Sequence, residues 1–170
     1  MRNKVILVTG ASSGMGVETA KALAQQGNRA YGAARRLKKM AALKQYGVTP
    51  IKLDVTDEAS SKATVAEIIA KEGRIDVLID NAGYISYGAI EDVDLAEAKH
   101  QLDVNLFGLA ALTKNVLPYM RSSIPVRLST FHRWVVAWYR LWAAGIMRPS
   151  MQLKLLAMLC EWKQSSLVLM

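Results

Sequence analysis

The feature that most constrains this chain is the stretch VILVTGASSGMG at residues 5–16. An unbroken apolar run that ends in glycine is typical of a buried parallel strand. The residues that follow, MGVETAKALAQQG, repeat apolar side chains at helical spacing, so the glycine-rich loop joins a strand to a helix. A helix N-terminus offers unpaired N–H groups and a positive dipole end to a phosphate. The stretch therefore predicts a phosphate-binding loop.

The same strand–helix alternation continues to about residue 120. Strands separated by helices imply right-handed crossovers and a parallel sheet, so the predicted class is α/β. The expected strands are 4–10, 28–35, 49–55 and 74–80, and the expected helices are 15–27, 36–47, 56–73 and 94–120.

Four motifs in this order resemble the short-chain dehydrogenase/reductase family, over roughly residues 3–121. They are TGASSGMG at 9–16, DV at 54–55, NAG at 81–83 and VNLFG at 104–108. The resemblance implies a Rossmann-like, doubly wound parallel sheet and hydride transfer between NAD(H) or NADP(H) and a small-molecule alcohol or carbonyl. We expect a truncated sheet of strand order 3-2-1-4, with the strand at 74–80 as an exposed edge.

The resemblance also assigns individual residues. The coenzyme pyrophosphate would contact Gly10, Ser12, Ser13, Gly14, Met15 and Gly16, the adenine Asp54 and Val55, and the ribose and nicotinamide side Asn81, Ala82 and Gly83. Asn105 matches the family's helix asparagine, which organises a water in the proton relay. Two structural alternatives stay open: Asp54 caps the next helix, or Asn105 bonds a neighbouring loop. Asp80 stands where the family usually has a second asparagine.

Two arginines decide the expected coenzyme. Arg35 and Arg36 end the second predicted strand, where a member that prefers NAD(H) would place an acid for the ribose 2′-hydroxyl. Guanidinium groups suit a 2′-phosphate through charge-assisted bidentate hydrogen bonds. NADP(H) is therefore expected over NAD(H), and the alternative is that both arginines are simply solvated.

The catalytic groups of the family are missing. The resemblance calls for a serine and for Tyr-x-x-x-Lys, in which the lysine lowers the tyrosine pKa for proton transfer. None of the six tyrosines has a lysine four positions later, and Ser129 precedes no such pair. The chain is thus expected to be an inactive NAD(P)-dependent oxidoreductase. The alternative is a non-catalytic dinucleotide-binding fragment or a misfolded product.

Composition changes abruptly near residue 121. Residues 1–120 hold 15 basic and 13 acidic side chains, whereas residues 121–170 hold seven basic ones, a single acid and all four tryptophans. A single evolved domain seldom does that. The predicted organisation is a dinucleotide-binding domain at 1–121 and an atypical tail, irregular or helical, at 122–170.

We hypothesise that a frameshift produced the tail. Read one nucleotide earlier from the Ile124/Pro125 boundary, the genetic code permits a string that contains NISS and YHATK, the missing family motifs. Two positions of this string are fixed by the genetic code. Read one nucleotide earlier, the codons of Trp134 and Val135, and those of Trp142 and Ala143, must each give glycine. The hypothesis is out-of-frame translation from about residues 121–124. The alternative is a genuine helix that covers the sheet edge or lies on a membrane surface.

The remaining expectations concern environment and partners. Lone Cys160 forms no internal disulfide, and no signal-peptide h-region follows the N-terminus, so a cytoplasmic location is expected. Apolar runs in the tail are too short for a membrane span. No nucleic acid and no metal site is expected, because no ordered basic face precedes the tail and both histidines are isolated. A homo-oligomer is compatible with the family resemblance.

Overall fold

The computed structural model describes residues 2–86, 88, 91–121 and 127–130. Of the expected irregular or helical tail at 122–170, residues 122–126 and 131–170 lie outside the described residues. The elements in chain order are β1 (Val5–Thr9), α1 (Gly14–Gln25), β2 (Arg29–Ala34), the 3₁₀ helix η1 (Leu37–Tyr46), β3 (Val48–Lys52), α2 (Glu58–Glu72), β4 (Val77–Asp80), α3 (Leu95–Leu102), the π-turn η2 (Asp103–Phe107), α4 (Gly108–Arg121) and β5 (Arg127–Thr130).

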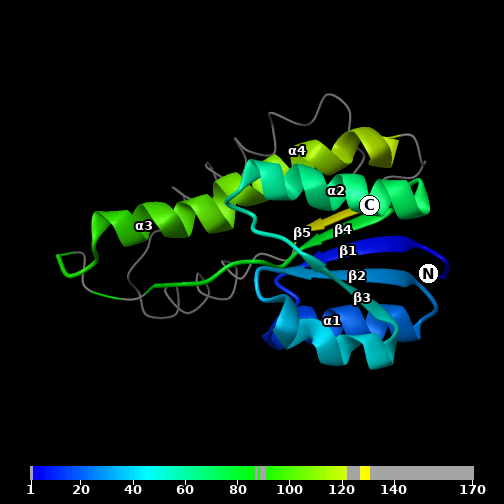
Figure 1. Cartoon of the computed structure of the whole chain (residues 1–170). Coiled ribbons are helices and arrows are strands. Elements are labelled where there is room, and N and C mark those ends of the chain that lie inside the picture. The colour runs from blue at the N-terminus through cyan, green and yellow to red at the C-terminus, as the bar shows by residue number, and fades with distance from the viewer. Residues whose placement is uncertain (1, 87, 89–90, 122–126, 131–170) are drawn as a thin grey trace. The chain divides into compact units, whose positions relative to one another are not determined.

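The strands form one parallel sheet in the order β3-β2-β1-β4-β5 (Figure 1). The predicted order 3-2-1-4 is confirmed. All five residues of β1 are buried, as expected for a strand that is covered on both faces. The carboxyl ends of the parallel strands share one edge of the sheet, where the loop after β1 meets the loops after β2, β3 and β4.

The fifth strand corrects the expected edge. β4 pairs in parallel with β5, in a register that runs from Val77 opposite Arg127 to Asp80 opposite Thr130. The expectation that β4 forms an exposed edge is therefore wrong. β5 belongs to the segment that was expected to be irregular or helical, and it forms a strand because the free edge of β4 supplies its hydrogen bonds. The domain boundary at 121/122 stays a prediction.

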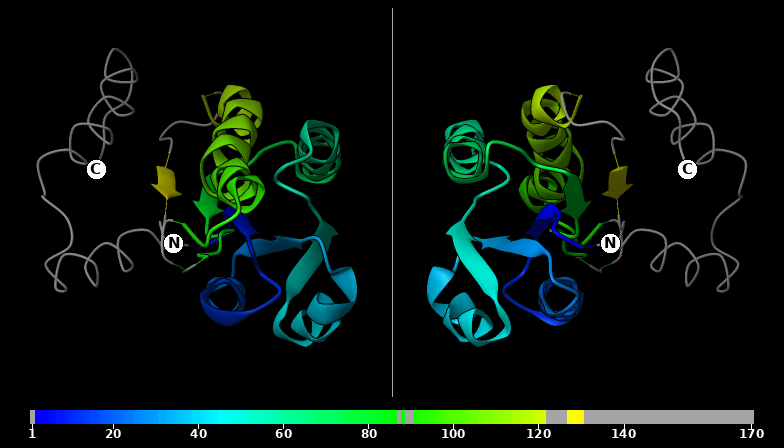
Figure 2. Two further views of the ribbon diagram at one scale, coloured as in Figure 1. Left: turned by 90° about the vertical axis from the view of Figure 1, so that its left-hand side faces the viewer. Right: turned by 90° about the vertical axis from the view of Figure 1, so that its right-hand side faces the viewer.

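Helices cover both faces of the sheet (Figure 2), and an apolar layer lies under each set of helices. The layer under α2 and α4 contains Leu7, Ile68, Leu78 and Leu112, each 0% exposed. The layer under α1 and η1 contains Ile6, Val8, Ala20 and Met40, also fully buried. Alternate residues of β1 point into opposite layers, as the pleat requires. The core therefore holds the carboxyl ends of β1 and β4 rigidly, which is where the candidate site lies.

Two helices differ from the expectation in kind. The segment after β2 is a 3₁₀ helix, anchored by Met40 and Leu43. The predicted helix 94–120 is continuous in the chain but contains a π-turn at Asp103–Phe107 between α3 and α4. Among the residues that the structure describes, no helix combines the length and apolar character that a membrane crossing demands.

Candidate functional site

The glycine-rich loop leaves the start of α1 open to an anion. α1 begins at Gly14, and its N-cap residue Ser13 makes no side-chain capping bond. No acidic residue lies in the first helical turn, so the positive end of the helix dipole is not neutralised. The Ser13 side chain is exposed, and its hydroxyl is a donor available to a ligand.

Glycine is required in this loop because backbone and side chains approach closely. A Cβ on Gly16 would lie 2.5 Å from the Gly10 carbonyl oxygen and 2.5 Å from Asn81 Nδ2. Gly10 itself adopts a φ of +66°, which disfavours other residues. A Cβ on Gly14, in contrast, would meet no atom within 4 Å. The loop thus forms a cradle with backbone N–H groups and open space in front of it, which fits a pyrophosphate.

A buried threonine ties this loop to the end of β4. The Thr9 hydroxyl oxygen accepts hydrogen bonds from the backbone N–H groups of Asn81 and Ala82, each at 2.9 Å. Asn81 returns the contact, because its Nδ2 donates to the Thr9 carbonyl oxygen at 3.1 Å. The NAG segment and the glycine-rich loop are therefore held together as one unit.

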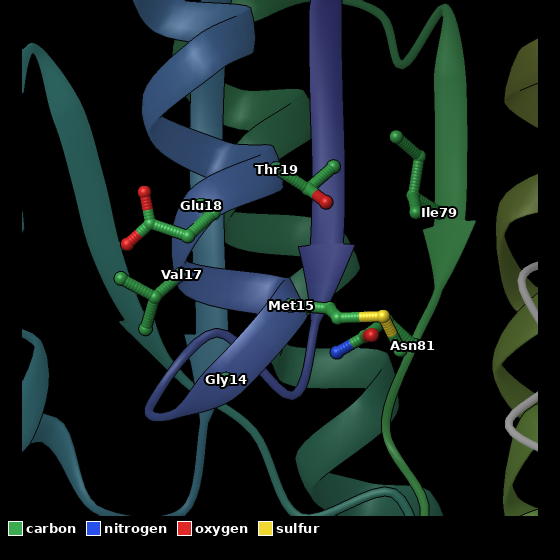
Figure 3. A pocket seen from close by; sticks show the side chains of 7 residues that line it. All are labelled: Gly14, Met15, Val17, Glu18, Thr19, Ile79 and Asn81. Atoms are coloured by element: carbon green, nitrogen blue, oxygen red, sulfur yellow. The ribbon is translucent and has the colours of Figure 1, made fainter.

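A cavity of about 760 Å³ lies beside this unit, between the first turns of α1 and the end of β4 (Figure 3). The Met15 side chain reaches across toward Asn81, and Thr19 and Ile79 face the same space. Among the residues that the structure describes, the lining comprises Gly14, Met15, Val17, Glu18, Thr19, Ile79 and Asn81. The cavity therefore adjoins the glycine-rich loop on the α1 side of the sheet.

Asp54 lies at the end of β3 with a fixed carboxylate. Its Oδ1 accepts from the Thr56 hydroxyl at 2.7 Å and from the Thr56 amide at 3.1 Å. Burial works against the charged form, but these hydrogen bonds and the charges of Arg35 and His100 outweigh it, so the pKa of Asp54 is lowered. The helix α2 is capped by Asp57, which accepts from the Ala59 amide at 2.9 Å. Asp54 therefore does not cap α2.

Arg35 and Arg36 follow β2 and are both exposed. Arg35 is close enough to Asp54 and Tyr84 for its charge to favour the ionised form of each group, although burial and Glu97 raise the pKa of Tyr84 overall. Arg36 is the N-cap residue of η1, and its side chain makes no capping bond. Both guanidinium groups thus lie at the sheet edge that carries Asp54 and the NAG segment.

The Asn105 side chain forms hydrogen bonds with the loop after the NAG motif. Its Oδ1 accepts from the Tyr84 amide at 3.0 Å, and its Nδ2 donates to the Tyr84 carbonyl at 2.7 Å. The side chain therefore bonds a neighbouring loop, and its role in a proton relay stays a prediction. A Cβ on Gly83 would lie 2.8 Å from Asn105 Oδ1, which shows why the motif has glycine there.

Asp80 faces away from the glycine-rich loop. Its side chain is 1% exposed, and its Oδ2 accepts from the Thr113 hydroxyl of α4 at 3.2 Å. Successive strand residues alternate between faces, so Asp80 points toward α4 while Asn81 points toward the glycine-rich loop. The departure from asparagine is thus accommodated by a polar partner on the helix.

Sequence reasoning missed three contributors. Thr9 was taken only as part of the glycine motif, although its hydroxyl joins β1 to the NAG segment. Tyr84 supplies the backbone groups that Asn105 binds. A Cβ on Gly108 would lie 2.5 Å from the Val55 carbonyl oxygen, so this glycine lets α4 approach the loop after β3. The glycine at the end of VNLFG is the one signal that could have indicated the last contact.

Comparisons with known proteins agree with this geometry. The family model of the short chain dehydrogenases matches residues 4–125. The 3-ketodihydrosphingosine reductase of Bacteroides thetaiotaomicron is 41% identical over 123 residues, which cover 72% of this chain and 44% of that protein.

Solved structures give the same result. A short-chain dehydrogenase from Streptomyces avermitilis superposes with a TM-score of 0.73 at 36% identity, over 76% of this chain and 49% of that one. An actinorhodin polyketide ketoreductase with NADPH superposes with a TM-score of 0.72 at 30% identity, over 76% and 54%. This chain thus spans about half the length of the relatives that it matches. Its motifs, its sheet order and these matches together show that the chain belongs to the short-chain dehydrogenase family.

Proposed function

We propose that residues 1–121 form an NADP(H)-binding domain of the oxidoreductase type, and that this chain is catalytically inactive. The observation that carries the binding proposal is the open cradle formed by Gly10, Gly14 and Gly16 at the uncapped start of α1. The coenzyme, when bound, would supply a hydride donor or acceptor for an alcohol or carbonyl. The less favoured alternative is an active reductase.

The chain's own residues would divide the binding work. Backbone N–H groups and the hydroxyls of Ser12 and Ser13 would hold the pyrophosphate. The Asp54 carboxylate, kept ionised by Thr56, would accept from the adenine amino group. Asn81, Ala82 and Gly83 would border the ribose and nicotinamide, in a position fixed by Thr9.

The preference for NADP(H) rests on Arg35 and Arg36. We expect NADPH to bind more tightly than NADH in a fluorescence titration, because charge-assisted hydrogen bonds to a 2′-phosphate contribute about 1.5–3 kcal/mol each. The variant R35Q/R36Q should weaken NADPH binding by roughly tenfold or more and leave NADH binding nearly unchanged. K114Q, which removes one charge on α4, is the control. Tighter binding of NADH to the unaltered chain would contradict the preference.

The proposed inactivity rests on the missing acid–base pair. No Tyr-x-x-x-Lys occurs in the sequence, and burial together with the Glu97 carboxylate raises the pKa of Tyr84, the tyrosine beside the site. Such a shift is opposite to the one that a proton-transferring phenol needs. Loss of acid–base catalysis alone should cost roughly 10²–10⁴-fold in rate. Consumption of NADPH above the blank with a panel of ketones would refute the proposal.

A frameshift near residues 121–124 is the proposed origin of the missing pair. The family match ends at residue 125, close to this boundary. Sequencing of the coding DNA tests the frameshift directly. When the tail's DNA is read one nucleotide earlier, it must encode the YHATK string. Restoring that frame should produce a protein that oxidises NADPH with a suitable ketone. Codons that do not spell the string would end the hypothesis.

A further inference from the structure

Positive charge in this domain is concentrated on one side of the candidate site. Residues 28–53 contain seven Lys and Arg and no Asp or Glu, whereas residues 54–120 contain five basic and twelve acidic side chains. The basic part spans β2, η1 and β3, and the acidic part begins immediately afterwards at Asp54. Four of the seven basic residues, Arg35, Arg36, Lys38 and Lys39, directly follow β2 and so lie at its carboxyl end.

The exposed cations of η1 also lack acidic partners. Within the described part of the chain, ion pairs neutralise Lys4, Lys21, Arg29, Lys62 and others, but none involves Lys38, Lys39 or Lys44. All three side chains are exposed, because Met40 and Leu43 turn the other face of η1 into the core. Their charge therefore projects into solvent without neutralisation.

The position of Lys38 and Lys39 links this charge to the coenzyme site. The Lys39 amide donates to the Arg36 carbonyl at 3.1 Å, so both lysines lie in the turn that follows the two arginines. With a rise of about 2 Å per residue, they lie within about 6 Å of Arg36 along the 3₁₀ axis. That distance is shorter than the Debye length of about 8 Å at physiological ionic strength.

We infer that Lys38 and Lys39 determine coenzyme specificity kinetically, by steering the 2′-phosphate end of NADPH toward the end of β2. This inference rests on the proposed dinucleotide binding. The 2′-phosphate adds about 1.5–2 negative charges that NADH lacks, so the lysines accelerate association of NADPH more than that of NADH. Steering of this kind changes the association rate and leaves the dissociation rate unaltered.

Stopped-flow fluorescence with NADPH and NADH tests the inference on the full chain. The variant K38Q/K39Q should slow NADPH association by roughly 3–10-fold at low ionic strength, with a smaller effect on NADH and an unchanged dissociation rate. The difference should disappear at about 0.5 M salt, where the Debye length is about 4 Å. The matched control K114Q/R121Q removes the same charge from exposed positions of α4, on the opposite face of the sheet.

The results of this experiment distinguish a failure of the steering role from a failure of the proposed dinucleotide binding. An equal effect of the control, an effect that persists at high salt, or a change confined to dissociation would overturn the steering role. The charge-reversal variant K38E/K39E changes the charge by four instead of two, so it should double the logarithm of the salt-dependent fold-change. Thermal unfolding without coenzyme checks that each variant folds. Failure of the unaltered chain to bind either coenzyme would instead contradict the proposed function, and the inference with it.

Discussion

A single hydroxyl group, that of Thr9, connects three backbone groups at the candidate site. It accepts from two N–H groups after β4 and donates to the Ile79 carbonyl at 3.4 Å, while Thr9 is 0% exposed. Thr9→Val keeps the shape and removes these bonds, so two backbone donors lose their partner. We expect the free energy of unfolding to fall by about 1–3 kcal/mol. Chemical denaturation measures the change.

Thr9→Ser is the matched control for this prediction. Serine keeps the hydroxyl and loses one methyl group. Thr9→Ser should therefore lower the free energy of unfolding much less than Thr9→Val does, and it should retain the proposed coenzyme binding. If serine and valine destabilise the chain equally, packing of the methyl group and not the hydrogen bonds accounts for the role of Thr9.

At this scale the sequence predicted residue types better than their contacts. The glycines of the loop were identifiable because only backbone atoms fit where a Cβ on Gly16 would lie. The commitment of Asn105 to Tyr84 depends on a loop more than 20 positions away, which no local pattern reports. The capping of α2 by Asp57 and not by Asp54 likewise depends on where the helix begins.

Among the elements, β2 and the end of α2 are joined by a polar contact whose strength depends on pH. The Tyr31 hydroxyl donates to Glu72 at 2.8 Å, and Glu72 also pairs with Arg29. Burial and the Glu72 carboxylate raise the pKa of Tyr31 to about 12, against 10.0 for a free tyrosine. The stabilisation is therefore complete below about pH 10 and is lost as the pH rises toward 12, because the unfolded chain deprotonates first.

Tyr31→Phe measures this contribution. At neutral pH the variant should unfold with a free energy lower by about 1–2 kcal/mol. The difference from the unaltered chain should shrink between about pH 10 and pH 11.5. Tyr46→Phe, at an exposed position on η1, is the control, because it removes a tyrosine hydroxyl and leaves the contact between Tyr31 and Glu72 in place. A difference that stays constant over this range would refute the linkage.

The kind of helix was harder to predict than its presence. Met40 and Leu43 are three positions apart, a spacing that suits both an α-helix and a 3₁₀ helix, so the apolar pattern of η1 does not separate the two. The π-turn at Asp103–Phe107 inserts a residue without breaking the helix, and it lies where the Asn105 side chain binds the Tyr84 backbone.

At the scale of the molecule, the predicted strands were confirmed where the sequence itself contains apolar runs separated by helical segments. β1 to β4 have apolar runs and intervening helices, and their observed order is the one that the family resemblance implies. β5, with the sequence RLST, has neither an apolar run nor a clear alternation. It forms because the edge of β4 supplies hydrogen bonds, a tertiary effect that overrides local propensity.

Two truncations test what β5 contributes. A chain that ends at residue 130 keeps β5, whereas one that ends at residue 126 leaves the outer edge of β4 unpaired. Only the shorter chain should lose hydrogen-exchange protection at the β4 amides and aggregate, because an open parallel edge is a template for pairing with another chain. Equal protection and solubility in both would show that β5 does not shield the sheet. In that case the domain folds independently of everything after α4, and the proposed frame change would remove the family's catalytic groups without unfolding the proposed coenzyme-binding domain.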